Sequence, residues 1–358
     1  MYKYVHGGAA AFEPGGRIRF DLSANINPLG FPDGVTEAVL SGAESWRTYP
    51  DSFSTALREK IAEAEGVAPD RIFCGNGASD ILFRLAPGCK AKKALIPVPS
   101  FSEYERSARV GGAEIAFHAL AEETGFAVDH SLLAAIEREK PDLFYLCNPN
   151  NPTGVLTERG LIETALERAA ETNTLFIIDE CFMDFVEGAE AYTAKPLLKR
   201  FPNLVILKAF TKTFALPGLR LGYALAGSAA VVDSLYACGP DWPVSAAAQA
   251  AGIAALRSAD VFLKKTAGYI AEENAKMRTA LADNGFSIFG SCANYIFFKS
   301  PYSFDLCARL DEKGIRIRDC GNFRGLPQGY YRAAVSTREA NATFITAIKE
   351  VIHCQARS

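Results

Sequence analysis

The sequence lacks an excess of positive charge, and it has no long uninterrupted apolar segment. Its 38 Lys and Arg residues against 41 Asp and Glu residues give a formal net charge of −3, so the positive field typical of nucleic-acid binding is missing. The most apolar long stretch, 213–232, is interrupted by Pro217, Gly218 and Arg220, which argues against a membrane span. Residues 1–17 are glycine-rich and lack the apolar core of a signal peptide. We therefore expect a cytoplasmic protein that binds neither nucleic acid nor membrane.

Cysteine and histidine are present without the spacing that disulfide frameworks or metal sites require. The nine cysteines are an odd number, and no two have C-x-x-C spacing. The four histidines fall in no cluster of metal ligands. We expect reduced cysteines in an apolar interior and no bound metal.

The remaining composition is that of an ordinary globular protein. The 358 residues are 49% hydrophobic and 22% charged, which excludes disordered, collagen-like and coiled-coil chains and suggests about two domains. Short apolar runs alternate with helical stretches, and several runs lack polar alternation, as in strands covered by helices on both faces. The expected strands of this part are 71–74, 93–98, 114–119, 143–147, 175–178, 204–209 and 219–226. The fold class is thus α/β with a mainly parallel central sheet.

The pattern changes after Gly227. A long alanine-rich helical stretch over 245–284 is followed by a smaller α+β unit, with expected strands at 293–298, 315–318 and 331–335. Expected helices at 304–313 and 339–352 complete it. The predicted division is an N-terminal arm (1–30) with one short strand at 18–22, a large domain (31–230) and a small C-terminal domain (231–358).

Ligands of parallel α/β sheets bind beyond the carboxyl ends of the strands, so the residues found there are the candidates. The first expected strand is followed by Gly75-Asn76-Gly77-Ala78-Ser79, where small residues and a helix N-terminus would admit a phosphate. Phe101 follows the second, and an aromatic ring there stacks on a flat ligand or fills the core. Asn151 lies in an Asn-Pro-rich turn that is either purely structural or aims an amide at a ligand.

Charged residues follow three more strands. Asp179 follows a buried strand directly, and it needs a positive partner such as a cationic ring nitrogen. Lys212 comes just after 204–209 and is either a surface charge or an amine that bonds a carbonyl carbon as an imine. Arg220 opens the next strand. Each residue alone fits a structural role, but together they are the parts that hold pyridoxal phosphate as an electron sink.

These motifs resemble fold-type I pyridoxal-phosphate enzymes of the class I/II aminotransferase superfamily, over nearly the whole chain. The resemblance is closest to the branch with histidinol-phosphate aminotransferase and L-threonine O-3-phosphate decarboxylase. Two features look like the decarboxylase: the arm, with His6-Gly7-Gly8 and the segment 21–30, and Asp179-Glu180-Cys181-Phe182, where aminotransferases of the group usually have Tyr in place of Phe182. The implied fold is that of aspartate aminotransferase.

The resemblance also implies roles for individual residues. Lys212 would bond the cofactor covalently, Asp179 would pair with the pyridine nitrogen, Asn151 would donate to the 3′ oxygen, and Phe101 would stack on the ring. The cofactor phosphate would be bound by residues from two subunits of a homodimer, namely Gly77, Ala78, Ser79, Thr211, Arg220 and Tyr49 of the second subunit. The substrate would be bound through its carboxylate by Arg338 and through its phosphate by His6, Asn25 and Arg324, with Asn151 also near it.

The activity implied by the resemblance is decarboxylation of O-phospho-L-threonine to (R)-1-aminopropan-2-yl phosphate, for the nucleotide loop of cobalamin. The alternatives are an aminotransferase acting on histidinol phosphate or a related amino acid, and a non-catalytic cofactor-binding protein. Two positions depart from the family pattern. Ala209 stands where a hydroxyl often binds the cofactor phosphate, and Phe182 cannot donate a hydrogen bond to the 3′ oxygen.

Overall fold

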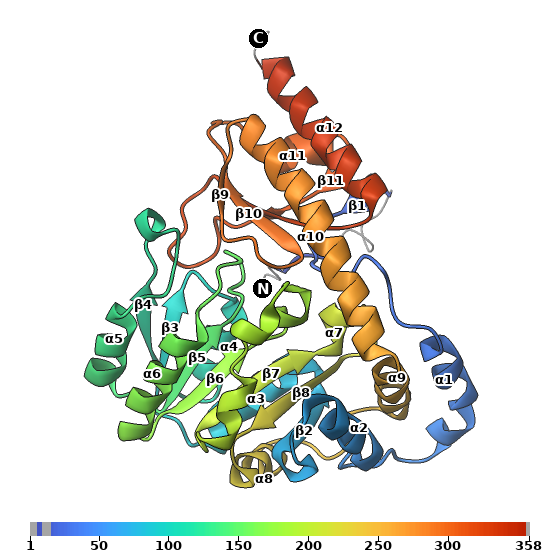
Figure 1. The fold of residues 1–358 in the computed structure, drawn as a ribbon, viewed down its shortest axis with the longest axis vertical. Helices are drawn as coiled ribbons and strands as arrows, with labels where there is room; N and C mark the ends of the chain where they lie inside the picture. The colour runs from blue at the N-terminus through green and yellow to red at the C-terminus, as the bar shows by residue number, and fades with distance from the viewer. Residues whose placement is uncertain (1–5, 9–15, 356–358) are drawn as a thin grey trace.

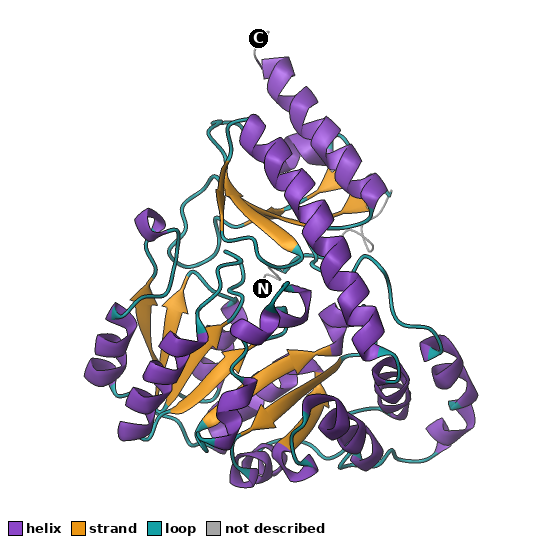
Figure 2. Cartoon of the chain, viewed as in Figure 1, coloured by secondary structure: helices purple, strands orange, loops and turns teal. Residues whose placement is uncertain are grey.

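The computed structural model describes residues 6–8 and 16–355, and its helices and strands form a larger and a smaller lobe (Figures 1 and 2). The larger lobe contains a seven-stranded sheet with the order β2-β8-β7-β6-β5-β3-β4. β8 is antiparallel to both of its neighbours, and the other strand pairs are parallel. The strands are β2 (Ile72–Asn76), β3 (Lys93–Val98), β4 (Glu114–Ala119), β5 (Leu143–Cys147), β6 (Leu175–Asp179), β7 (Leu204–Ala209) and β8 (Leu221–Ala226).

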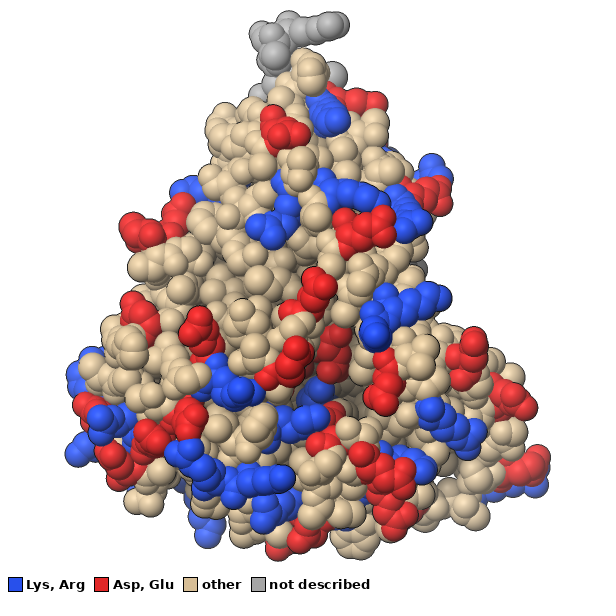
Figure 3. All heavy atoms as spheres, viewed as in Figure 1, with Lys and Arg blue, Asp and Glu red and all other residues tan. Residues whose placement is uncertain are grey.

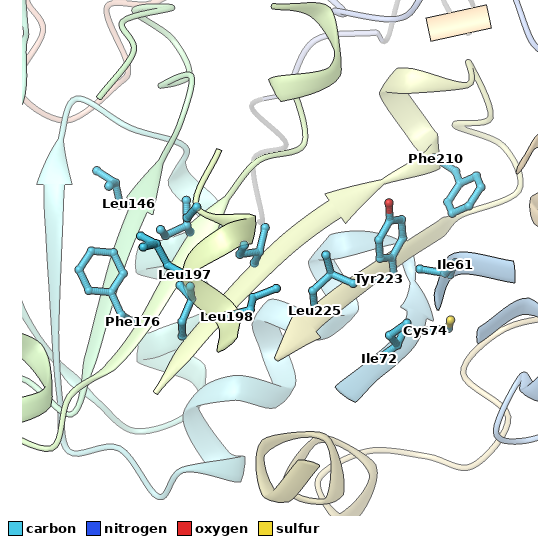
Figure 4. Close-up of a cluster of buried hydrophobic side chains, with 14 of the residues drawn as sticks. Ile61, Ile72, Cys74, Leu146, Phe176, Leu197, Leu198, Phe210, Tyr223 and Leu225 are labelled. Atoms are coloured by element: carbon cyan, nitrogen blue, oxygen red, sulfur yellow. The ribbon is translucent and has the colours of Figure 1, made fainter. Parts of the chain in front are cut away.

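All seven strands expected in this lobe are present, and four have the predicted limits. They could be recognised because a central strand of a covered sheet is apolar on both faces. In β7, Leu204 and Ile206 belong to the core on one face of the sheet, whereas Val205 and Leu207 belong to the core on the other. Figure 4 shows part of the first of these cores.

Helices cover both faces of the large sheet, as the lack of polar alternation predicts. One face is covered by α2 (Thr55–Glu65), α5 (Ser131–Glu139), α6 (Arg159–Glu171) and α9 (Ala246–Leu256). The other is covered by α3 (Gly77–Gly88), α4 (Ser102–Val110) and α8 (Ala229–Ala237). Helix α1 (Val35–Ser41), which was not predicted, contributes only Val35 to the buried core.

The smaller lobe has a four-stranded antiparallel sheet with the order β12-β13-β10-β9. Its elements are β9 (Ser287–Phe289), β10 (Tyr295–Lys299), α11 (Leu306–Asp311), β12 (Arg318–Asp319), β13 (Tyr330–Ala334) and α12 (Arg338–Gln355). A short parallel pair, β1 (Phe20–Asp21) with β11 (Ile315–Arg316), joins the N-terminal segment to this lobe. The strand β9 was not predicted, and the single strand expected over 315–318 is two short ones.

The helical stretch expected over 245–284 is two helices. α9 ends at Leu256, and α10 (Ala259–Asp283) begins after a break at Arg257 and Ser258. Ala259 packs in a core of the larger lobe, whereas Ile270 and Met277 pack in the core of the smaller lobe, so α10 connects the two. The division at residues 30 and 230 stays a prediction.

Among the described residues, no helix is both long and apolar enough to cross a membrane, and no cluster of side chains is suited to hold a metal ion. Eight of the nine cysteines, from Cys74 to Cys320, are free thiols. On the face shown in Figure 3, acidic and basic side chains are interspersed.

Candidate active site

A cavity of about 760 Å³ lies beyond the carboxyl ends of the parallel strands and is also lined by residues of the smaller lobe. This is the edge at which the sequence places its candidates. The candidates that line the cavity are His6, Asn25, Ala78, Ser79, Phe101, Asn151, Asp179, Thr211, Lys212, Arg220 and Arg324. Gly77, Tyr49 and Arg338 do not line it.

Lys212 lies in the single-turn helix α7 (Phe210–Thr213), which follows β7 directly. Burial and the positive charges of Arg332 and Arg220 lower the pKa of its amine from 10.5 to about 8, and Cys181 opposes this shift only in part. At pH 7 about one molecule in ten then has a neutral amine, against about one in three thousand for an ordinary lysine. Lys212 is therefore a usable nucleophile at neutral pH.

The carboxylate of Asp179 is held in one orientation at the end of β6. Tyr104 donates its hydroxyl to Oδ2 at 2.6 Å, and the backbone N–H of Cys181 donates to Oδ1 at 3.0 Å. Asp179 is only 8% exposed, yet it has no ion pair within the described residues. A buried carboxylate in this setting favours a ligand that brings a positive charge.

An anion cradle is formed where α3 begins. Gly77 has a φ of 77°, and a Cβ atom there would lie 2.7 Å from Nη2 of Arg220, so the guanidinium approaches the backbone at the start of the helix. Gly222 is needed for a similar reason, because a Cβ atom there would lie 2.4 Å from the backbone nitrogen of Ala78. Free N–H groups at a helix N-terminus beside an arginine suit a phosphate. Thr211 also lines the cavity, next to Ala209.

Asn151 is held by Arg332, a cavity residue that the sequence prediction missed. Arg332 is buried in β13; its Nη1 donates to Oδ1 of Asn151, and its Nη2 donates to the carbonyl oxygen of Ser23 at 2.9 Å. The Nδ2 group of Asn151 is thereby left to serve a ligand. Arg332 could have been found from the sequence, because Tyr330–Ala334 is an apolar strand with one charge in it.

The structure does not place Arg338 in the cavity, which corrects the carboxylate-binding role assigned to it. Arg338 is the first residue of α12, and its side chain is 66% exposed. Its guanidinium pairs with Glu272 at 3.1 Å and Glu273 at 3.4 Å on α10. The positive charge beside Lys212 and Asn151 comes from Arg332 instead.

Polar groups of the N-terminal segment also line the cavity. His6 Nε2 is 3.0 Å from Oε1 of Glu103, and this contact lowers the pKa of the Glu103 carboxyl. Asn25 is 2% exposed, and its Oδ1 has no hydrogen-bond partner in the described residues.

Two arginines of the smaller lobe also line the cavity. Arg324 donates to both carboxylate oxygens of Glu105, at 2.9 and 3.0 Å. Arg318, which was not predicted, also lines the cavity.

Two aromatic side chains complete the wall. The ring of Phe101 contacts His6 and Tyr104, with centroid distances of 5.6 and 5.7 Å. Phe182 is buried and packs edge-on against Tyr295. Neither ring adds a hydrogen-bonding group, so the polar chemistry rests on Lys212, Asp179, Asn151 and the arginines.

The lowered pKa of Lys212 gives a direct prediction for the protein without ligand. Because only the neutral amine is nucleophilic, acetylation of Lys212 should rise about tenfold per pH unit below pH 7 and level off above about pH 8. Competitive labelling with acetic anhydride and peptide mass spectrometry measures this profile. A midpoint near the ordinary value of 10.5 would contradict the environment described for this amine.

Known proteins resemble this chain over almost its whole length. The family described as aminotransferase class I and II matches residues 17–348. Threonine-phosphate decarboxylase of Salmonella typhimurium is 34% identical over 93% of this chain and 91% of its own. Histidinol-phosphate aminotransferase of Caldanaerobacter subterraneus is also 34% identical, over 93% of both chains. The solved histidinol-phosphate aminotransferase of Clostridium acetobutylicum has a TM-score of 0.86 at 30% identity, covering 93% of this chain and 98% of its own. The predicted fold class is confirmed by this likeness.

Proposed function

The chain belongs to the aminotransferase class I and II family, and from this premise we propose that it decarboxylates O-phospho-L-threonine to (R)-1-aminopropan-2-yl phosphate. It is a pyridoxal-phosphate-dependent enzyme. The observation that carries the choice of reaction is that three arginines besides Arg220 line the cavity: Arg332 beside Asn151, its cross-strand neighbour Arg318, and Arg324. They suit a substrate with a carboxylate on the reacting carbon and a phosphate a few atoms away. The similarity to threonine-phosphate decarboxylases supports the same substrate.

The residues in the cavity fit the cofactor. The cradle formed by Gly77, Ala78, Ser79 and Arg220 would take its phosphate, with Thr211 in place of the hydroxyl that Ala209 lacks. The buried Asp179 would hold a proton on the ring nitrogen, and Phe101 would cover one face of the ring. Nδ2 of Asn151 would donate to the 3′ oxygen, because its Oδ1 is occupied by Arg332.

Bound pyridoxal phosphate supplies an electron sink, which accepts the electron pair of a bond broken at the substrate's Cα. The neutral amine of Lys212 would bond the cofactor, and after its release the protonated amine would deliver a proton to Cα. Arg332, whose buried Nε has no hydrogen-bond partner in the described residues, would bind the substrate carboxylate. The substrate phosphate would be held by His6, Asn25, Arg318 and Arg324, which also line the cavity. Holding both ends of the substrate would fix which bond at Cα is broken, and in this proposal it is the bond to the carboxylate.

The second candidate is transfer of the amino group from histidinol phosphate, and the identity to histidinol-phosphate aminotransferases favours it. Mass spectrometry of products from O-phospho-L-threonine with 2-oxoglutarate present separates the two. Aminopropanol phosphate without glutamate supports the decarboxylase. Formation of glutamate would show a transaminase and overturn the proposal.

A homodimer with shared active sites is part of the proposal. Tyr49 is 78% exposed, stacks on Trp242 at 4.4 Å, and lies outside the cavity of its own chain. Trp46 and Phe53 are more than half exposed nearby in sequence, and exposed aromatic groups of this kind favour a protein interface. Sedimentation equilibrium should give twice the chain mass of 38.7 kDa, and Tyr49→Ala should weaken cofactor binding. A monomer of full activity would contradict this arrangement.

A further inference from the structure

A cluster of charged side chains packs on the face of the large sheet that carries Leu204 and Ile206 of β7, and none of its members lines the cavity. Lys208 points to the same side as Leu204 and Ile206, and its Nζ lies 2.6 Å from Oδ1 of Asp184 and 3.4 Å from Oε1 of Glu65. All three side chains are less than a fifth exposed. The cluster is separate from the residues assigned above to cofactor or substrate.

The charges in this cluster are balanced by further contacts. Glu65, the last residue of α2, accepts a hydrogen bond from the Tyr223 hydroxyl at 2.5 Å and pairs with Lys195 at 3.0 Å. Burial alone would raise the pKa of Glu65, but Lys208, Lys195 and the Tyr223 hydroxyl lower it to about 2. Figure 4 shows Tyr223 beside Ile61 and Phe210 in the surrounding core.

Burying such a cluster costs desolvation energy that ion pairing roughly offsets, so net stability is a weak reason for its presence. The position of the cluster suggests a different reason for its presence. Asp184 belongs to the turn η5 (Met183–Phe185), a few residues after Asp179, and its Oδ2 accepts a hydrogen bond from the Thr213 hydroxyl at 3.1 Å. Thr213 directly follows Lys212 in α7.

The same short helix is held on another side by the N-terminal segment. Asn27 donates its side-chain amide to the carbonyl oxygen of Thr213 at 2.7 Å, and its backbone N–H donates to the carbonyl oxygen of Lys212 at 3.2 Å. A helix of one turn has few bonds of its own, so its position depends on these outside contacts. The pairing of β6 with β7 already places the start of α7 near Asp179, and Asp184 adds a side-chain contact from the segment after Asp179 to the end of α7.

We propose that Asp184, fixed by Lys208, positions Lys212 relative to Asp179 by anchoring α7 through the Thr213 hydroxyl. Lys208, Asp184 and Thr213 are thus positioning residues, and this inference rests on the proposed function of the cavity. The rationale is that reacting groups misplaced by about 1 Å can lose about 100-fold in rate.

Three variants test the anchor. Thr213→Val keeps the shape and removes the hydroxyl, whereas Thr213→Ser restores it. Lys195→Gln is the matched control, because it removes a charge from Glu65 but leaves the contacts of Asp184 and Thr213 intact. The readouts are kcat and KM of the holoenzyme with O-phospho-L-threonine, and the pH profile of Lys212 acetylation in the apoenzyme.

For Thr213→Val we expect kcat to fall about tenfold with KM within about twofold, and the Lys212 midpoint to move up from about pH 8. The variants Thr213→Ser and Lys195→Gln should keep kcat, KM and the Lys212 midpoint close to their wild-type values. A Thr213→Val enzyme with wild-type kcat and an unmoved Lys212 profile would overturn the anchor. The acetylation profile needs no substrate, so it still decides the matter if the reaction itself has been assigned wrongly.

Discussion

Replacing Lys212 with alanine is expected to lower kcat by about 10³-fold or more, because the variant loses both the nucleophile and the proton donor. The side chain lies in the cavity beside Arg332 and Arg220, and the pKa of about 8 describes an amine prepared to react. Residues in the described part offer no second lysine that lines this cavity. Substitution therefore cannot be compensated by a neighbour.

The measurement is single-turnover kinetics together with the absorbance spectrum of the bound cofactor. Lys199→Ala is the matched control, since Lys199 is an exposed lysine away from the cavity and its loss should leave kcat unchanged. Circular dichroism and the melting temperature confirm that both variants are folded. Substantial turnover in a folded Lys212→Ala enzyme would contradict the role of this residue.

Substitution of Arg332 is expected to lower activity far more than substitution of Arg338. Arg332→Lys should lower kcat/KM about 10- to 100-fold, because a lysine cannot keep the contacts to Asn151 and Ser23 and also bind a carboxylate. Arg338→Ala should keep kcat/KM within about twofold, because Arg338 lies outside the cavity and its ion pair with Glu272 is exposed. The buried Glu273 keeps its contacts with Lys276 and Asn341. Steady-state kinetics of both variants, with melting temperatures as the control for folding, provide the comparison. The reverse pattern would restore Arg338 as the carboxylate-binding residue.

Much of the larger lobe was predictable because its strands are covered on both faces. Continuous apolar runs such as Leu143–Cys147 and Leu204–Ala209 give a strong signal, and the residues just after them must lie at one edge of a parallel sheet. This is why Asp179, Asn151 and Lys212 were found together from the sequence and line one cavity in the structure.

The smaller lobe was harder to predict because Arg332, the candidate for binding the carboxylate, lies within a strand and not after it. Arg332 and Arg338 are close in sequence, and spacing alone does not tell which of them turns inward. The direction of the Arg332 side chain is set by the alternation of side chains along β13, whereas Arg338 is at the start of α12 and pairs with Glu272. The break between α9 and α10 was missed for a similar reason, because helical periodicity continues on both sides of Arg257 and Ser258.

The anchor formed by Asp184 and Thr213 shows what sequence patterns leave out altogether. Lys208 and Asp184 come from separate segments, and in the sequence each looks like an ordinary charged residue near the end of a strand. Only the three-dimensional contact of 2.6 Å between them gives Asp184 a fixed place from which to hold α7.

The most direct test of the proposed reaction uses O-phospho-L-threonine labelled with carbon-13 in its carboxyl group, incubated with the holoenzyme in deuterated water. The account predicts one labelled carbon dioxide for each aminopropanol phosphate formed, with one deuterium on the carbon that carried the carboxylate. Retention of the labelled carboxylate, with deuterium exchanged into the substrate or a keto acid formed from it, would contradict the decarboxylase.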